Sequence, residues 1–431
     1  MTGAKGITVG RLAVLVALAV VLAVAATLLV TRAGSDGAGD GRGGSGGDRA
    51  GQGGPGSGRP PPASQSAGAS YAYTTEKGLV LMREGRPPVR VPRVFDLADP
   101  LNNTVVWTHD GRRVVFLSDD AMLEQPEETR LITVDAGTGG IRRLPCPGCY
   151  DLAPVGDHEV AVLGWQDGDT RALRFDLTDP DPDATGTRIT TPAGNGSSWQ
   201  IRFLGGTRDH LLTAQYTITA DGDTGMDLRL LDADGRETAA YRPPFDSNAN
   251  MPAALATVGG RDRIAVAARN NPGGCVAPFP IHPLGLRGEV GGSDQTAALP
   301  PGYIAGVTGG IDVRDLWWGP DRHLYATIAA WTCDNSRRTE DDKKKRHRPA
   351  TLFRLDGDRW VSAGDQPATV VRPLDRGTRM VLTIPDCVGR IDALGPADTV
   401  TYCNTGTLHR ERGGKRTKVA DAVLSLSAPP R

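Results

Sequence analysis

A short polar corner between two apolar segments recurs along this chain and restricts its fold more than any other sequence feature. The clearest copy is VVWTHDGRRVVFL, from residue 105, in which two apolar stretches flank the dipeptide Asp-Gly. Each copy predicts two antiparallel strands and a tight turn, because Gly and Asp adopt the backbone angles that such turns need. Six such corners lie 45 to 61 residues apart, at Gly111, Gly156, Gly206, Gly260, Asp321 and Gly377.

A second hairpin follows most of these corners, as in TRLITVDAGTGGIRRL from residue 129 and DLRLLDADGRETAAY from residue 227. The repeating unit is therefore a four-stranded antiparallel meander. One such sheet is too small to be stable alone, but several sheets packed around a common axis bury both faces of each. The pattern predicts an all-β propeller, and it explains apolar runs such as residues 114–117 that do not alternate with polar residues.

The two ends of the repetitive region predict how the ring closes. Residues 70–91 contain three expected strands with no first strand before them, and DAVLSLSAPP, from residue 421, is a lone strand. We expect the C-terminal strand to supply the missing first strand. Six internal blades and one composite blade then make a seven-bladed β-propeller of four-stranded antiparallel blades. Six or eight blades are the alternatives, because residues 378–420 have an irregular pattern.

The corner sequence resembles that of TolB-type propeller repeats. Trp107, Asp110 and Gly111 match the Trp-Ser-Pro-Asp-Gly corner of that family, although Thr108 and His109 replace its Ser-Pro pair. The resemblance extends over residues 71–430 in degenerate form, without WD-repeat dipeptides, and implies the propeller fold and periplasmic contacts with other proteins. No counterpart of the N-terminal domain of TolB is expected. A partial copy of the corner occurs at Trp318, Pro320 and Asp321.

The N-terminal residues predict a membrane anchor and a linker. Residues 12–31 carry no charge over a length that spans roughly 30 Å as a helix, enough to cross a bilayer. Basic residues before this segment favour a cytoplasmic stub at residues 1–11, so the propeller, residues 71–431, would lie outside a single-pass cell membrane anchor. A cleaved signal peptide is the alternative. Residues 32–70 are rich in Gly, Ser and Pro, which predicts a disordered linker.

Six cysteines in an extracytoplasmic protein predict disulfide bonds. We expect Cys275 to pair with Cys333, because each follows the second strand of an adjacent blade, and Cys387 to pair with Cys403, because they bracket one insertion. A redox role for the sequence CPGC would need a following helix, which is not expected, so a structural bridge or a free turn is favoured. The two cysteines of the CPGC segment are Cys146 and Cys149.

The sequence contains no pattern that predicts a catalytic, cofactor or metal site. Four of the seven histidines lie at or beside blade corners, where a structural role is expected: His109, His158, His210 and His323. The acidic segments at residues 179–183 and 221–227 lack the spacing of calcium loops, and no histidine pair accompanies the one close cysteine pair as zinc would require.

Most of the expected insertions fall on one face of the propeller, opposite the corners. They are residues 118–129, 164–171, 220–226, 270–302, 332–349 and 385–404. Such one-sided elaboration of a rigid scaffold is typical of a binding face. Trp165 and Trp331 flank these loops and are candidate ligand anchors, with capping of the blade core as the alternative. A basic run could attract an anionic partner or form a self-neutralising solvated loop with the preceding acids; it comprises Lys343, Lys344, Lys345, Arg346 and Arg348.

Together these features predict a membrane-anchored extracytoplasmic platform, a monomer that binds an envelope protein or a cell-wall polymer. The formal charge of −1 and the pI of about 6.7 argue against a nucleic-acid partner. A propeller hydrolase of the lactonase or glycan-cleaving type, with its site at the channel mouth, is the alternative function.

Overall fold

The computed structural model describes residues 70–92, 105–118, 129–166, 169–181, 183–190, 201–218, 224–241, 252–267, 281–284, 309–333, 344–375, 377–385 and 405–430. All of them belong to the compact unit Ser64–Arg431. The predicted stub, anchor and linker therefore lie outside the described residues. No helix among the described residues is long and apolar enough to cross a membrane.

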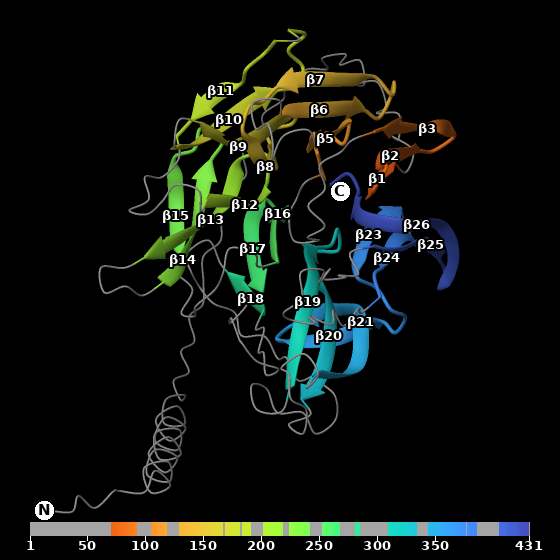
Figure 1. Ribbon diagram of the computed structural model, residues 1–431. Helices are drawn as coiled ribbons and strands as arrows, with labels where there is room; N and C mark the ends of the chain where they lie inside the picture. Colours follow the sequence, from red (N-terminus) through yellow and green to blue (C-terminus); the bar gives the residue numbers. More distant parts are fainter. Residues whose placement is uncertain are drawn as a thin grey trace, which may run out of the picture. The chain divides into compact units, whose positions relative to one another are not determined.

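The described residues form an all-β fold of antiparallel sheets, as the sequence predicts (Figure 1). Four sheets have four strands each, and one has three described strands. The strands of these sheets, in chain order, are β4 (Val105–Trp107), β5 (Arg113–Leu117), β6 (Arg130–Asp135) and β7 (Ile141–Pro145); β8 (Cys149–Val155), β9 (Glu159–Gln166), β10 (Asp169–Asp176) and β11 (Thr187–Ile189); β12 (Ile201–Gly206), β13 (His210–Ile218), β14 (Thr224–Asp232) and β15 (Glu237–Tyr241); β16 (Ala253–Val258), β17 (Arg261–Ala267) and β18 (Ile281–Leu284); β19 (Gly309–Trp318), β20 (Leu324–Cys333), β21 (Lys344–Asp356) and β22 (Arg359–Gly364).

A seven-stranded sheet joins the two ends of the described chain in the order β23-β24-β25-β26-β1-β2-β3 (Figure 1, blue and orange). The long strand β26 pairs with β25 through its first half and with β1 through its second half, where Leu426 lies opposite Tyr73. The predicted pairing of the C-terminal strand with the first N-terminal strand is therefore confirmed. The strands are β1 (Tyr71–Thr75), β2 (Gly78–Arg83), β3 (Arg86–Val91), β23 (Val370–Asp375), β24 (Thr378–Thr383), β25 (Gly406–Arg412) and β26 (Lys415–Ser427).

Each sheet packs against the next through an apolar cluster, so that both of its faces contribute to the core. Val115 and Leu117 of one sheet, for example, pack with Val160 and Val162 of the following sheet. The two halves of the seven-stranded sheet also pack together, because Tyr73 of β1 shares a cluster with Met380 of β24. This burial of both faces explains why many strands are continuously apolar.

All six predicted corners join antiparallel strands, namely β4–β5, β8–β9, β12–β13, β16–β17, β19–β20 and β23–β24. We call this end of each sheet the corner end, and the other end, where the insertions were expected, the insertion end.

Four of the expected insertions contain strand residues: 164–171, 220–226, 270–302 and 332–349 overlap β9 and β10, β14, β18, and β20 and β21. β9 and β10 extend the hairpin until Gln166 lies opposite Asp169. β20 extends to Cys333, and β21 begins at Lys344, so residues 344–348 of the basic run pair with β20 instead of forming a loop. The irregular sequence pattern of residues 378–420 likewise did not predict the regular strands β24, β25 and β26, which the structure contains. Polar sequences form these strands because a neighbouring strand supplies their backbone hydrogen bonds.

Candidate functional site

Trp165 is an exposed aromatic side chain at the insertion end of β9. It is 40% exposed, which is unusual in this chain because most large apolar side chains of the described residues are buried. Alternate residues of a strand share a face, so Trp165 continues the row of Leu163 and Ala161, which pack into the cluster against the β12 sheet. Its ring therefore extends an apolar core to the surface, and such amphipathic aromatic rings commonly anchor binding partners.

The turn beside Trp165 is the CPGC segment between β7 and β8. Cys149 donates its backbone N–H to the carbonyl of Cys146 at 3.1 Å, and Gly148 has a φ of +72°, as expected for a type II turn with Pro and Gly at its centre. The two sulfur atoms are joined in a disulfide bond. The Trp165 N–H donates to the Gly148 carbonyl at 2.9 Å, so the bridged turn fixes the backbone that carries the tryptophan.

Both cysteines of this turn are 1% exposed and lie in the apolar cluster between two sheets. The turn is followed by strand β8 and not by a helix. Neither the burial nor the local backbone resembles the exposed helix N-terminus at which reactive thiols have a lowered pKa. The arrangement favours a structural role for the bridge.

The other candidate residues are only partly placed. Trp331 lies in β20, opposite Gly310 and Arg346, and Cys333 is the last residue of that strand. Lys344, Lys345 and Arg348 lie in β21. The remaining candidates lie outside the described residues: Lys343, Cys275, Cys387 and Cys403.

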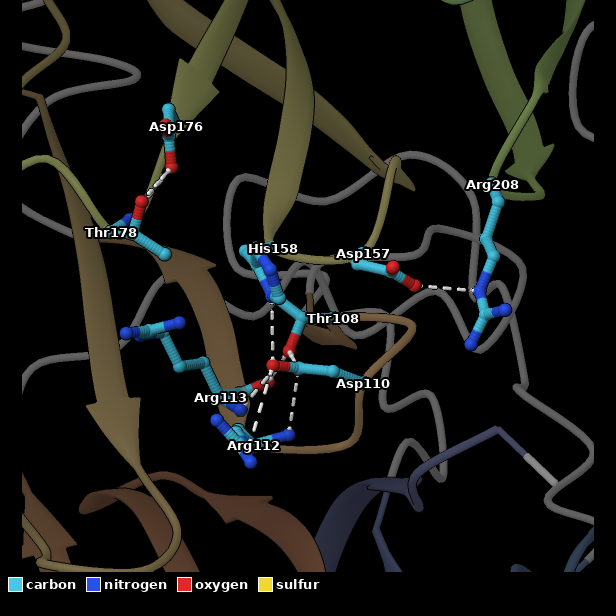
Figure 2. Close-up of polar contacts among 9 residues, drawn as sticks. All are labelled: Thr108, Asp110, Arg112, Arg113, Asp157, His158, Asp176, Thr178 and Arg208. Atoms are coloured by element: carbon cyan, nitrogen blue, oxygen red, sulfur yellow. Dashed lines mark hydrogen bonds and ion pairs between the residues drawn. The ribbon is translucent and has the colours of Figure 1, made fainter. Parts of the chain in front are cut away.

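At the corner ends, polar side chains connect neighbouring sheets (Figure 2). Asp110 accepts hydrogen bonds from the Thr108 hydroxyl at 2.6 Å and from the Arg112 N–H at 2.9 Å, which close its own corner. Its other oxygen lies 3.0 Å from Nδ1 of His158 in the next corner. Burial by itself would raise the pKa of Asp110, but these hydrogen bonds outweigh burial and lower the pKa below its usual value.

The chain of corner contacts continues along the sheets. Asp157 pairs with Arg208 at 2.7 Å, as Figure 2 shows, and the Gly156 N–H donates to the Arg208 carbonyl at 2.9 Å. In the next corner, Nδ1 of His210 lies 2.7 Å from a carboxylate oxygen of Asp262. The histidines at these corners thus have structural partners. Their contacts connect neighbouring sheets and do not form an open catalytic site.

His109 is another corner histidine with a perturbed environment. Its burial lowers the pKa, although backbone carbonyls of Pro154 and Thr207 act in the opposite direction. His109 therefore lies close to two neighbouring sheets, to the β8 sheet at Pro154 and to the β12 sheet at Thr207. These neighbours suit the ring of His109 to packing the corner ends together.

Sequence reasoning missed the buried acid Asp151 of β8. Burial raises its pKa to about 6, and Arg202 and two backbone N–H groups only partly offset this effect. The β-bulge between Cys149 and Asp151 turns the carboxylate toward the neighbouring sheet. No sequence pattern predicts such a bulge. Within the described residues, no group of three or more His, Cys, Asp or Glu could hold a metal ion.

No family model and no curated protein matches this chain. Several solved structures are similar in fold. The β-propeller domain of the Trilobed protease from Pyrococcus furiosus matches with 11% identity over 82% of this chain and 98% of that chain, at a TM-score of 0.43. TolB from Acinetobacter baumannii matches with 12% identity over 68% and 65%, at 0.34. Pyrococcus horikoshii acylaminoacyl peptidase matches with 10% identity over 80% and 48%, at 0.46, so this chain spans about half of that protein.

Proposed function

We propose that the chain is a membrane-anchored, extracytoplasmic, seven-bladed β-propeller that acts as a monomeric binding platform for an envelope protein or a cell-wall polymer. The blade number rests on the packing order. Apolar clusters connect each sheet to the next and return from β23–β25 to β1 and β2, so β26 divides the seven-stranded sheet into two blades. That division supports a count of seven blades.

The binding role rests on one observation, the exposed Trp165 on its bridged turn. A tryptophan exposes a large apolar area that a bound partner would remove from water. Because the disulfide and the Gly148 contact already fix its backbone, binding would cost little conformational entropy. The insertion end of the propeller therefore serves as the binding face.

Three ionisable groups with structural contacts support binding rather than catalysis. Asp110, Asp151 and His109 have shifted pKa values, and each of them contacts a neighbouring sheet. These structural contacts account for the pKa shifts. None of the three groups is therefore left to act as a general acid or base with another of them. The hydrolase of the lactonase or glycan-cleaving type remains the competing function, and its signature would be turnover by the purified chain.

The uncharged segment at residues 12–31 supports the anchor. Alkaline extraction of membranes should leave the full-length chain in the pellet. A soluble mature protein that begins near residue 26 would instead identify a cleaved signal peptide and refute the anchor.

The binding face is tested by crosslinking in intact cells followed by capture of the full chain. Trp165→Ala should remove the specific crosslinked partner. Ile141→Ala is the matched control, because Ile141 is also 40% exposed but begins the outer strand β7 near the corner end. Equal crosslinking in both variants would contradict the proposal, and lactone or glycan hydrolysis by the purified protein would favour the enzyme.

A further inference from the structure

The β25–β26 hairpin concentrates positive charge in a protein whose total charge is nearly balanced. Between Arg410 and Lys418 the chain has five cations and one acid. Two glycines with positive φ, Gly413 and Gly414, form the two-residue turn of this hairpin. The turn lies at the corner end of the blade, and the cations lie along both strands.

The single acid between Arg410 and Lys418 is already neutralised. Glu411 is buried and accepts hydrogen bonds from Nε of Arg379 and from Nε of Arg416, both at 2.8 Å. Among the described residues, Arg410, Arg412 and Lys415 form no ion pair, and all three are exposed. These three side chains therefore carry unpaired positive charge into solvent.

The pairing register places Arg410 in the seam between the two halves of the seven-stranded sheet. Directly opposed residues in antiparallel strands point to the same face. Arg410 is opposite Met380, which belongs to the apolar cluster of this seam. On the other side, Arg90 is opposite Val80 of the same cluster. Arg90 is also exposed, so both halves of the sheet direct an arginine toward this seam.

We call Arg90, Arg410, Arg412 and Lys415 the basic seam. Arg412 lies two residues after Arg410, on the same face of β25, and Lys415 lies opposite Arg412. Arg410 and Arg412 also act on Asp375, whose pKa is lowered first by the Thr378 hydroxyl and also by these two arginines. Two cations of the basic seam thus act on this one exposed carboxylate.

Protection of a sheet edge explains only part of this charge. Lysines on an outer strand discourage pairing with other chains, and Lys415 of β26 fits that role. Arg410 and Arg412 lie on β25, which is hydrogen-bonded on both sides by β24 and β26. They protect no free edge, and folding does not require two exposed arginines at these positions.

We propose that the basic seam binds a linear polymer that carries phosphate groups. Guanidinium groups form bidentate hydrogen bonds with phosphate, and alternate residues on a strand present such groups about 7 Å apart. A flexible chain of phosphates can match such a row, and it releases counterions as it binds. The inference deepens the proposed function, because it gives a ligand class to a second surface, away from Trp165.

The test uses the full chain purified in neutral detergent, with inorganic polyphosphate as the probe. Binding of fluorescent polyphosphate is measured over a range of salt concentrations for Arg410→Gln/Arg412→Gln/Lys415→Gln. The matched control neutralises three exposed arginines on other sheets, Arg188→Gln/Arg261→Gln/Arg359→Gln. We expect the seam variant to lose about tenfold or more in affinity and the salt slope to fall by about two, since about 0.7 counterions are released per contact. The control should stay within about twofold.

Three outcomes would overturn the proposal: no binding by the wild-type chain, equal losses in the two triple variants, or an unchanged salt slope. A lipid surface is the competing source of phosphate. Acetylation of Lys415 should be blocked by polyphosphate and not by phosphatidylglycerol vesicles; the reverse would assign the seam to lipid headgroups. Trp165→Ala should bind polyphosphate normally, so failure of this proposal and failure of the Trp165 binding face remain distinguishable.

Discussion

The carboxylate of Asp151 in β8 accepts a hydrogen bond from the backbone N–H of Phe203 in β12, at 2.7 Å, and so connects two neighbouring sheets. The same device recurs between β19 and β23, where Asp315 accepts from the Val371 N–H at 3.3 Å. In both sheets the acid follows a β-bulge and also accepts from the N–H of the next residue. Both acids lie near an arginine of the partner strand, Arg202 or Arg372.

Asp151 should make stability depend on pH. Its folded pKa of about 6 lies above the ordinary value of 3.8, so folding favours the protonated acid. This contribution is fully present below about pH 4 and is lost as the pH rises through about 6. The free energy of unfolding should therefore fall by about 3 kcal/mol from about pH 3 to about pH 8, relative to Asp151→Asn. Denaturant titrations at several pH values check this, with the exposed Asp358→Asn as the control; parallel curves for wild type and Asp151→Asn would contradict it.

Gly148→Ala should disrupt the bridged turn beside Trp165. A Cβ at this position would lie 2.1 Å from the Trp165 carbonyl oxygen, and its φ of +72° disfavours any side chain. Gly85→Ala is a matched control, because Gly85 has a φ of +68° with nothing within 4 Å of the added carbon. The control should cost about 1–2 kcal/mol from backbone strain alone. Thermal melting should show a clearly larger loss for Gly148→Ala, and similar losses would disprove the steric argument.

Deletion of residues 421–431 should open the closed arrangement of sheets. It removes the half of β26 that pairs with β1, including the buried Val423 and Leu426, and leaves strand edges unpaired. We expect a lower melting temperature and aggregation. Leu426→Ala, which keeps the strand, should cost about 2–4 kcal/mol. Deletion of residues 429–431 alone is the control; if the longer deletion melts like this control, the C-terminal strand does not close the ring.

Glu411→Gln should destabilise the β25–β26 hairpin at neutral pH. Burial raises the pKa of Glu411, but the hydrogen bonds from Arg416 and Arg379 outweigh it, so the folded pKa lies below the ordinary value of 4.5. The stabilisation is therefore present above pH 4.5 and is lost as the pH falls through the folded pKa. We expect a loss of about 1–3 kcal/mol at pH 7 that shrinks in acid. Asp421→Asn, which removes an exposed pair with Lys418, should change little. A pH-independent loss for Glu411→Gln would indicate a packing defect instead.

Peptide mapping without reductant should find the Cys146–Cys149 bridge that closes the turn before β8. The sequence also predicts bridges between Cys275 and Cys333 and between Cys387 and Cys403. Each long-range closure should contribute about 2–4 kcal/mol to stability. Free thiols at these four positions, measured by alkylation before denaturation, would refute the long-range pairings.

The repeated corners determined the all-β fold, the antiparallel hairpins and the pairing of the C-terminal strand with β1. These features follow from local turn chemistry and from apolar runs, both of which are visible in the sequence. The segment at residues 12–31 likewise predicts an anchor from its composition alone. Sequence reasoning also identified Trp165 as a candidate. That its side chain is exposed beside the disulfide-bridged turn became apparent only from the packing of β8 and β9.

Tertiary structure decided what depends on distant partners. The basic run at residues 344–348 is polar enough for a loop, yet it forms strand because β20 offers it a partner. The basic seam combines Arg90 with Arg410, which are 320 positions apart, through register on one sheet. Asp151 acquires its raised pKa from burial at a bulge. Burial, register and bulges arise from contacts between residues far apart in the chain, and local sequence patterns carry no record of them.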